Sequence, residues 1–231
     1  MTDDDRLFAS SNTIRDIKTG RDMGEQDRPV VLIVCDWNGT LVDDAERACD
    51  ATNVVLGQFA LSNLSLGEFL EAFELPLERF FAGLGVADPD LATAGDVWNS
   101  EMAAHPTRLA RGAEAMLASA LAYGLPVGVV SAAATEAVEA DAEQLGIRSS
   151  LSFVTGRAAS KRSVLQRLVE EADGRVLYLG DTEYDMIEAV AAGAIPIGVA
   201  GGYRPAAALS SAGATYILDD LGMLLTGMQG F

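Results

Sequence analysis

The sequence predicts an α/β fold in which a parallel sheet is covered on both faces and carries an all-helical insertion. Two observations support this class: short runs rich in β-branched residues alternate with alanine-rich segments from Val30 onward, and one long interval contains helical patterns only. Apolar runs of this length between helices are typical of buried parallel strands. The expected strands are residues 30–35, 126–130, 152–154, 175–179, 195–199 and 215–218.

Two of the connecting helices have clear starting signals. Thr135 precedes a segment with apolar residues at helical spacing that ends at Gly146, and Ser160 precedes a second such segment. Serine and threonine favour the position before a helix because their hydroxyl accepts a free backbone N–H, whereas glycine favours the position after it. We therefore expect helices directly after Thr135 and Ser160, each crossing from one parallel strand to the next.

The long helical interval lies between the first two expected strands. A crossover between parallel strands needs only about a dozen residues, whereas residues 36–125 separate these two, and 44–105 contain helical patterns alone. We expect a polar N-terminal extension at 1–29, a core domain formed by 30–43 and 106–231, and a helical cap at 44–105. Ligands bind at the carboxyl ends of strands in such sheets, so the cap is a candidate lid.

Charge and cysteine content narrow the class of partner and the compartment. The 16 basic and 34 acidic residues give a net charge of −18, which argues against nucleic acid or an anionic membrane as a partner. Cys35 and Cys49 are too few for a disulfide framework. No apolar stretch or N-terminal signal indicates a membrane span or export. We expect a cytoplasmic protein, and the sequence does not indicate protein partners or an oligomeric state.

Residues capable of chemistry follow four of the expected strands. They are Asp36 with Gly39 and Thr40 after the first strand, Ser131 after the second, Lys161 at the start of the helix after the third, and Asp181 with Asp185 after the fourth. The carboxyl ends of neighbouring parallel strands meet at one edge of the sheet. We therefore expect these side chains to converge.

Clustered carboxylates repel one another unless a cation lies between them. Oxygen ligands of this kind suit Mg²⁺, so magnesium is the expected cofactor. The cation, Lys161, a hydroxyl from Thr40 or Ser131 and the backbone N–H groups of the turn at Gly39 would then surround a phosphoryl group. This arrangement leaves one aspartate free to attack phosphorus.

The order of these motifs resembles that of the haloacid dehalogenase superfamily. The resemblance is carried by DWNGTLVDD at 36–44, the serine after the second strand, the Ser-Lys pair at 160–161 and GDTEYDMIEAVAAG at 180–193, and it covers roughly residues 30–225. The helical insertion is similar to that of phosphoglycolate-phosphatase-like members. The resemblance implies a Rossmann-like core with the first strand at its centre, and a phosphatase acting on a small phosphorylated metabolite.

The resemblance also implies a role for each site residue. Asp36 would be the nucleophile that forms an aspartyl-phosphate. Ser131 would bind the phosphoryl oxygens, Lys161 would pair with the phosphoryl group and with Asp36, and Gly39 and Thr40 would complete the phosphate loop. The implied metal ligands are Asp36, the main-chain carbonyl of Asn38, Asp181 and, directly or through water, Asp185.

Asn38 departs from the family pattern. Phosphatases and phosphomutases of this family usually have an aspartate two positions after the nucleophile, where it protonates the leaving group and activates water. An amide cannot exchange a proton at neutral pH, and such assistance is worth about 10²- to 10⁴-fold in rate. Its loss should slow an alkyl phosphate more than an aryl or acyl phosphate. The alternative function is a catalytically weak phosphate-binding or regulatory protein.

Other chemistries of the family fit the sequence less well. Phosphonate-cleaving members use a lysine of the cap, and residues 44–105 contain none. Dehalogenation needs no metal and would leave Asp181 and Asp185 unexplained, whereas a mutase would need the missing acid twice per cycle. Hydrolysis of a phosphate ester therefore remains the favoured reaction.

Several polar residues near the motifs have structural interpretations. Asp43 or Asp44 is expected to cap the first helix of the insertion, and His105, the only histidine, is expected to be structural. Arg47 and Arg79 are the only arginines of the insertion. We favour solvated surface roles for both over recognition of an acidic group on the substrate.

Overall fold

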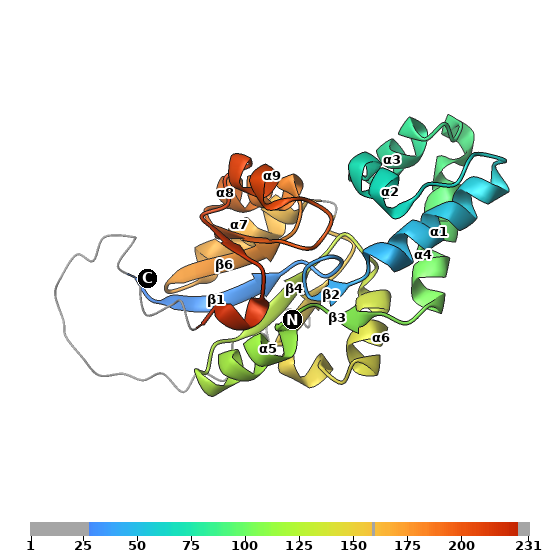
Figure 1. Cartoon of the computed structure of the whole chain (residues 1–231). Helices are drawn as coiled ribbons and strands as arrows, with labels where there is room; N and C mark the ends of the chain where they lie inside the picture. The colour runs from blue at the N-terminus through green and yellow to red at the C-terminus, as the bar shows by residue number, and fades with distance from the viewer. Residues whose placement is uncertain (1–27, 159, 226–231) are drawn as a thin grey trace, which may run out of the picture.

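The computed structural model describes residues 28–158 and 160–225 and contains a six-stranded sheet with helices on both faces (Figure 1). The strand order is β5-β4-β1-β6-β7-β8, and every neighbouring pair is parallel. β1 therefore lies inside the sheet, between β4 and β6. The expected α/β fold class is confirmed, whereas most of the extension expected at 1–29 lies outside the described residues.

The strands of this sheet begin and end within one residue of the expected positions. They are β1 (Val30–Cys35), β4 (Val127–Val130), β5 (Phe153–Thr155), β6 (Arg175–Gly180), β7 (Ile195–Val199) and β8 (Tyr216–Leu218). The agreement follows from composition, because a continuous apolar run can be buried on both sides in a parallel sheet that helices cover.

Helices of the core domain cover the two faces of the sheet. They are α5 (Ala113–Ala122), α6 (Thr135–Gln144), α7 (Lys161–Glu171), α8 (Glu183–Ala192) and α9 (Ala206–Ser211), with short 3₁₀ helices at Arg148–Ser150 and Leu221–Met223. Ser160 caps α7 as predicted, accepting the N–H of Ser163. Thr135 is instead the first residue of α6, and its hydroxyl accepts the N–H of Gly156 at 3.1 Å. None of the described helices has the length and apolarity needed to cross a membrane.

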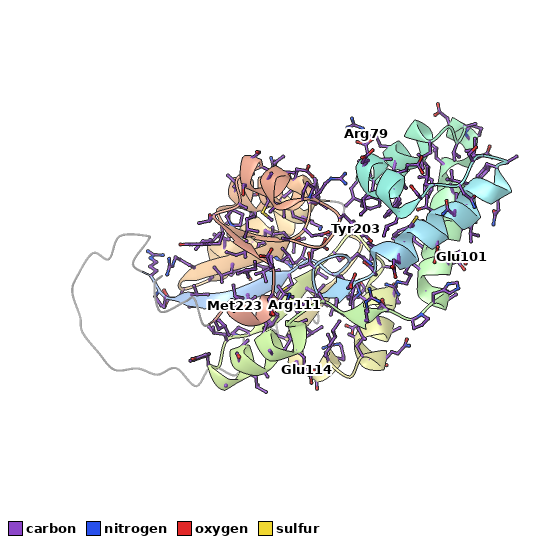
Figure 2. All side chains as sticks on the ribbon, viewed as in Figure 1. Arg79, Glu101, Arg111, Glu114, Tyr203 and Met223 are labelled. Carbon is purple, nitrogen blue, oxygen red and sulfur yellow. The ribbon has the colours of Figure 1, made fainter. Side chains whose placement is uncertain are left out.

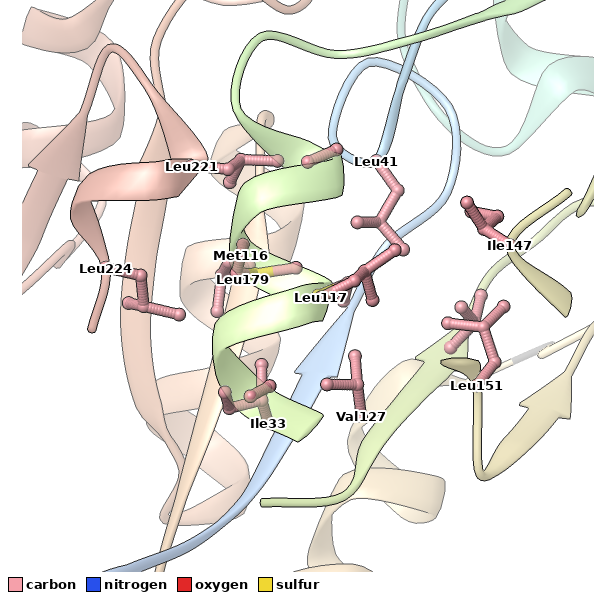
Figure 3. Packing of buried hydrophobic residues seen from close by; sticks show 14 of the residues in the cluster. Ile33, Leu41, Met116, Leu117, Val127, Ile147, Leu151, Leu179, Leu221 and Leu224 are labelled. Carbon is pink, nitrogen blue, oxygen red and sulfur yellow. The ribbon is translucent and has the colours of Figure 1, made fainter. Parts of the chain in front are cut away.

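Alternate residues of β1 enter two separate hydrophobic cores. Ile33 and Cys35 pack with residues of α5 and α6, and Figure 3 shows this packing around α5. Leu32 and Val34 pack with residues of α7 and α8 on the opposite face, which is the upper side of the sheet in Figure 1. Successive side chains of a strand point to opposite faces, so helices fix the carboxyl end of β1 from both sides.

The insertion consists of four helices that enclose a third hydrophobic core. The helices are α1 (Ala45–Gln58), α2 (Leu66–Ala72), α3 (Leu77–Gly83) and α4 (Leu91–Ala104), with a 3₁₀ helix at Asp88–Asp90. The largest residues that the insertion contributes to this core are Phe69, Phe73, Phe80, Phe81 and Trp98. A separate core supports the proposed division into a cap at 44–105 and a core domain at 30–43 and 106–231.

A short antiparallel ribbon joins the insertion to the core domain. β2 (Val42–Asp43) pairs with β3 (Arg108–Leu109), where the chain leaves the core domain and where it returns. Strands of two residues are too short to produce an alternating pattern, so the sequence did not indicate this ribbon.

Tyr203, in the loop after β7, lies between the core domain and the insertion (Figure 2), and the next residue, Arg204, also contacts the insertion. The Tyr203 ring contacts Phe73 and Phe69, with ring centroids 4.7 and 5.8 Å apart. Arg204 donates to the backbone carbonyls of Leu70 and Phe73. The aromatic core of the insertion is therefore completed by a residue of the core domain.

Replacing Tyr203 with alanine should lower the free energy of unfolding by about 3–5 kcal/mol, because the residue is only 4% exposed and packs against two phenylalanines. Tyr123→Ala is the matched control: Tyr123 is 69% exposed, and its loss should change this free energy by less than about 0.5 kcal/mol. Urea denaturation followed by circular dichroism measures both variants. Equal losses would contradict the packing described for Tyr203.

Candidate active site

The candidate site lies at the carboxyl end of β1, where the chain turns directly after a buried strand. The N–H of Asp36 bonds to the carbonyl of Leu179 on β6 at 2.8 Å, so strand pairing fixes the backbone of this aspartate. Gly39 has a φ of +72°, and a Cβ there would lie 2.1 Å from Oδ2 of Asp181. Only glycine therefore allows the turn to approach Asp181 this closely.

Lys161 is a buried cation at the centre of the site. Its Nζ lies 2.8 Å from Oδ2 of Asp36 and 2.6 Å from Oδ1 of Asp185, and its side chain is 1% exposed. Burial would lower the pKa of Lys161, but Asp185 and Asp36 outweigh burial and raise the pKa above its usual value. Lys161 therefore stays charged and bridges two aspartates.

Three buried carboxylates meet beside this lysine. Asp36, Asp181 and Asp185 have carboxylate oxygens within 4.8 Å of one another. Burial raises the pKa of Asp36 to about 6, with Lys161 opposing the rise and Asp185 adding to it. Burial, followed by Asp185 and Asp36, raises the pKa of Asp181 well above its usual range. These shifts reflect the cost of charging carboxylates away from water and beside like charges, a cost that a bound cation would reduce.

Two of the three carboxylates, those of Asp36 and Asp181, are arranged so that an oxygen atom of each could bind a metal ion. Oδ1 of Asp36 is buried and has no hydrogen-bond partner among the residues that the structure describes. Asp181 is held in place by the hydroxyl of Thr40 at 3.2 Å and the N–H of Tyr203 at 2.7 Å. An unpartnered buried carboxylate oxygen beside a second positioned carboxylate fits a hard divalent cation.

The third carboxylate, that of Asp185, is already saturated with donors. It accepts hydrogen bonds from Lys161, from the Tyr178 hydroxyl at 3.0 Å, and from the N–H and hydroxyl of Thr182 at the start of α8. A metal ion would have to displace one of these donors to contact Asp185 directly. The geometry therefore favours a water-mediated role for Asp185 over direct ligation.

A cavity of about 640 Å³ opens above these groups, between the sheet and the insertion. Of the predicted site residues, those that line it are Asp36, Asn38, Ser131 and Asp181. The Ser131 hydroxyl accepts the N–H of Ala133 at 3.2 Å, which fixes its position. The structure thus brings the nucleophile candidate, a hydroxyl and a metal-ligand candidate to the surface of one cavity.

Gly39 and Thr40 are directed away from the cavity and support the site from behind. The N–H of Gly39 donates to Oδ1 of Asp44 at 3.0 Å, and the hydroxyl of Thr40 donates to Asp181. Neither residue lines the cavity. Their observed contacts position the loop and Asp181, and the phosphate contacts expected from the sequence stay a prediction.

Asn38 faces the cavity and is oriented from behind by Asp44. Its amide nitrogen donates to Oδ2 of Asp44 at 2.5 Å. Asp44 also accepts hydrogen bonds from Gly39, from Arg47 at 3.1 Å and from the Tyr203 hydroxyl at 3.2 Å. The Asp44 carboxylate accepts in each of these bonds, and an ionised carboxylate has no proton to donate. The end of the Asn38 amide that faces Asp44 must therefore be its nitrogen, which can donate. The amide oxygen is then the atom of Asn38 available to a ligand.

The prediction that Asp43 or Asp44 caps α1 is wrong. Asp44 occupies the position before α1, but its side chain makes no capping hydrogen bond, because it is drawn toward Asn38 and Arg47. Asp43 pairs with Arg108 of the ribbon at 2.9 Å. One sequence signal could have identified this role of Asp44. Asn38 stands where the family usually has an aspartate, and an amide at that position can donate to a nearby acid such as Asp44.

The arginines of the insertion do not line the cavity. Arg47 is 7% exposed and pairs with Asp44 and with Asp141 of α6 at 3.0 Å, so the prediction of a solvated surface role is wrong for this residue. Arg79 is exposed and pairs with Glu74 at 3.1 Å. His105 follows α4 with an exposed side chain and is likewise outside the cavity lining.

Solved structures with the same fold share most of the chain's length at low sequence identity. A protein described as a predicted phosphatase from Clostridium acetobutylicum is 22% identical, with a TM-score of 0.76 over 87% of this chain and 99% of that chain. One described as a predicted phosphoglycolate phosphatase from Haemophilus somnus is 18% identical, with a TM-score of 0.75 over 87% and 98%. CbbY from Rhodobacter sphaeroides, solved in complex with phosphate, is 19% identical, with a TM-score of 0.72 over 87% and 100%.

A match to a protein-family model assigns the chain to a family, whereas the similar structures show the fold alone. No curated protein matches the sequence. The model of the haloacid dehalogenase-like hydrolases matches residues 33–199, which contain β1, the insertion and the strands that carry Ser131 and Asp181. The chain therefore belongs to the haloacid dehalogenase-like hydrolases.

Proposed function

We propose that the protein is a Mg²⁺-dependent phosphoric monoester hydrolase that acts on a small phosphorylated metabolite through an aspartyl-phosphate on Asp36. The observation that carries this proposal is the state of Asp36 on the cavity surface. One carboxylate oxygen pairs with Lys161 and the other is buried without a partner. The similar structures described as phosphatases, and the complex of CbbY with phosphate, support a phosphate ester as the substrate.

The proposed reaction consists of two displacements at phosphorus. The carboxylate of Asp36 attacks phosphorus, the bond from phosphorus to the ester oxygen breaks, and the leaving group departs with the electron pair. Water then attacks the same phosphorus, which breaks its bond to Asp36 and releases inorganic phosphate. Lys161 pairs with Asp36 and favours its charged form, and the Ser131 hydroxyl, which lines the cavity, would donate to a phosphoryl oxygen.

The residues that would hold Mg²⁺ are Asp36, the main-chain carbonyl of Asn38 and Asp181, with Asp185 acting through water. The ion would offset the negative charge of the transferring phosphoryl group. Hard oxygen ligands and clustered negative charge suit magnesium.

The alternative is a phosphate-binding or regulatory protein with little turnover. It is supported by Asn38, which cannot protonate a leaving group or activate water. Against it, Asp36, Lys161 and Asp181 are all present and close together, and a pure binding protein has no evident need for a nucleophile at position 36.

Asp36→Asn should reduce the hydrolysis of phosphate esters and acyl phosphates by at least about 10⁴-fold, because the amide is not nucleophilic. A colorimetric phosphate assay with Mg²⁺ and with a chelator measures the loss. Asp173→Asn is the matched control, since Asp173 is exposed and lies before β6, at the opposite end of the strands. Activity that survives Asp36→Asn would remove Asp36 as the nucleophile, and an inactive wild type would support the binding alternative.

Mg²⁺ should stabilise the protein more at pH 7.5 than at pH 5. Because the pKa of Asp36 is raised from 3.8 to about 6, its contribution to the stability of the metal-free protein is complete below about 3.8 and is lost as the pH rises through about 6. Mg²⁺ binds the deprotonated form and restores this stability. Thermal unfolding with and without Mg²⁺ tests the expectation, and Asp181→Asn should remove most of the shift. An equal shift at both pH values would contradict it.

Exchanging the amide and the acid, as Asn38→Asp with Asp44→Asn, should raise kcat for an alkyl phosphate by about 10-fold or more. The exchange places a carboxyl at the cavity and keeps a donor behind it, whereas Asn38→Asp alone sets two carboxyls against each other at the 2.5 Å contact. Activity on an aryl phosphate is the internal control and should change less. If alkyl-phosphate turnover does not rise, the missing acid is not what limits the enzyme.

A further inference from the structure

The cavity is much larger than a phosphoryl group. Its volume of about 640 Å³ lies in the range of roughly 300–1,000 Å³ that buries a drug-sized ligand. In the proposed function the phosphoryl group lies at the Asp36 end of the cavity. The remainder of the cavity is therefore available to the leaving group, and its wall decides which leaving groups fit.

The insertion supplies an apolar wall to this remaining space. Five of the seven residues that the insertion contributes to the lining are apolar, and the other two are Glu78 and Asn99, whose amide nitrogen donates to the carbonyl of Gly95. The five apolar residues are Phe73, Leu75, Pro76, Leu77 and Trp98. The ring nitrogen of Trp98 is already bonded to the Thr52 hydroxyl at 3.1 Å, so the indole offers carbon atoms, and no free donor, to a ligand. Such a wall favours a flat or branched apolar group over a polyhydroxylated one.

The charges around the cavity oppose a second anionic group. Glu78 is the charged residue that the insertion contributes to the lining. Arg157 lines the cavity from the core domain, but its guanidinium pairs with Glu136 at 3.1 Å. Within the part of the lining that the structure describes, a leaving group with its own carboxylate or phosphate would meet Glu78 without an unpaired arginine to offset it.

Asn38 restricts the leaving group independently of the wall. Because an amide supplies no proton, the ester oxygen must depart as an anion, which is easier for an aryl oxide than for an alkoxide. The wall and Asn38 therefore favour the same kind of ester.

We propose that the substrate is a phosphate monoester of an apolar phenol that carries no second anionic group. This proposal rests on the proposed function, because it places the phosphoryl group at Asp36. It also separates this site from one built for a phosphorylated acid, for which the insertion would need an available cation.

Two aryl phosphates of nearly equal leaving-group basicity test the proposal. We expect kcat/KM for 4-ethylphenyl phosphate to exceed that for 4-(carboxymethyl)phenyl phosphate by at least about fivefold, because only the second places a carboxylate near Glu78. Glu78→Gln should reduce this ratio about threefold. Glu71→Gln, an exposed acid of α2 outside the lining, should leave it unchanged. A ratio below fivefold, or one that Glu78→Gln does not lower, would overturn the proposal.

Binding measurements keep this test independent of turnover. Isothermal calorimetry of the Asp36→Asn variant with the same two esters should give the same order of affinity. If wild-type protein hydrolyses neither ester but the affinities keep this order, the hydrolase proposal fails and the assignment of the cavity wall stands. Equal affinities, or tighter binding of the carboxymethyl ester, would overturn the wall assignment whatever the turnover.

Discussion

The ion pairs of Lys161 with Asp36 and Asp185 are the interaction on which the site depends. Three carboxylates are buried together here, and without a cation they would repel one another in a medium that stabilises charge poorly. Removing one partner of such a buried pair typically costs about 3–5 kcal/mol. The lysine also joins the end of β1 to the starts of α7 and α8, so the same contact fixes the geometry of the site and stabilises the fold. Lys161 carries one positive charge, whereas three carboxylates carry up to three negative charges. The difference of up to two charges is why the site fits a divalent cation.

One loop, directly after β7, contacts both the insertion and the candidate site. The N–H of Tyr203 holds Asp181, its hydroxyl holds Asp44, and its ring completes the aromatic core of the insertion. Asp44 in turn orients Asn38 at the cavity. The position of the insertion and the orientation of the groups facing the substrate are therefore linked through one side chain. The cavity that results is lined by mainly apolar residues of the insertion on one side and by Asp36 and Asp181 of the core domain on the other.

Sequence patterns predicted the strands and the convergence of their polar ends because both follow from the chain's local composition. Apolar runs determine which strands are buried, and parallel strands bring their carboxyl ends together, so Asp36, Ser131, Lys161 and Asp181 could be grouped in advance. The hydrogen-bond partners could not be predicted, because they join residues far apart in the chain. Tyr203 reaches Asp44 across 159 positions, and no local pattern distinguishes a tyrosine that does so. Arg47 was taken for a surface residue for the same reason, because its partner Asp141 is 94 positions away. The interpretation of Asp44 as a helix cap instead overlooked two partners that are close in the chain, Asn38 and Arg47.

The central claim is that Asp36 attacks phosphorus and carries the phosphoryl group. Borohydride reduces an acyl phosphate to an alcohol, so reaction of the enzyme with an aryl phosphate and Mg²⁺, followed by acid quenching and reduction, should convert Asp36 to homoserine. Mass spectrometry of the peptide that contains residue 36 would show this change only when both substrate and Mg²⁺ are present. Substrate turnover without reduction at Asp36, or with reduction at another carboxylate, would contradict the account.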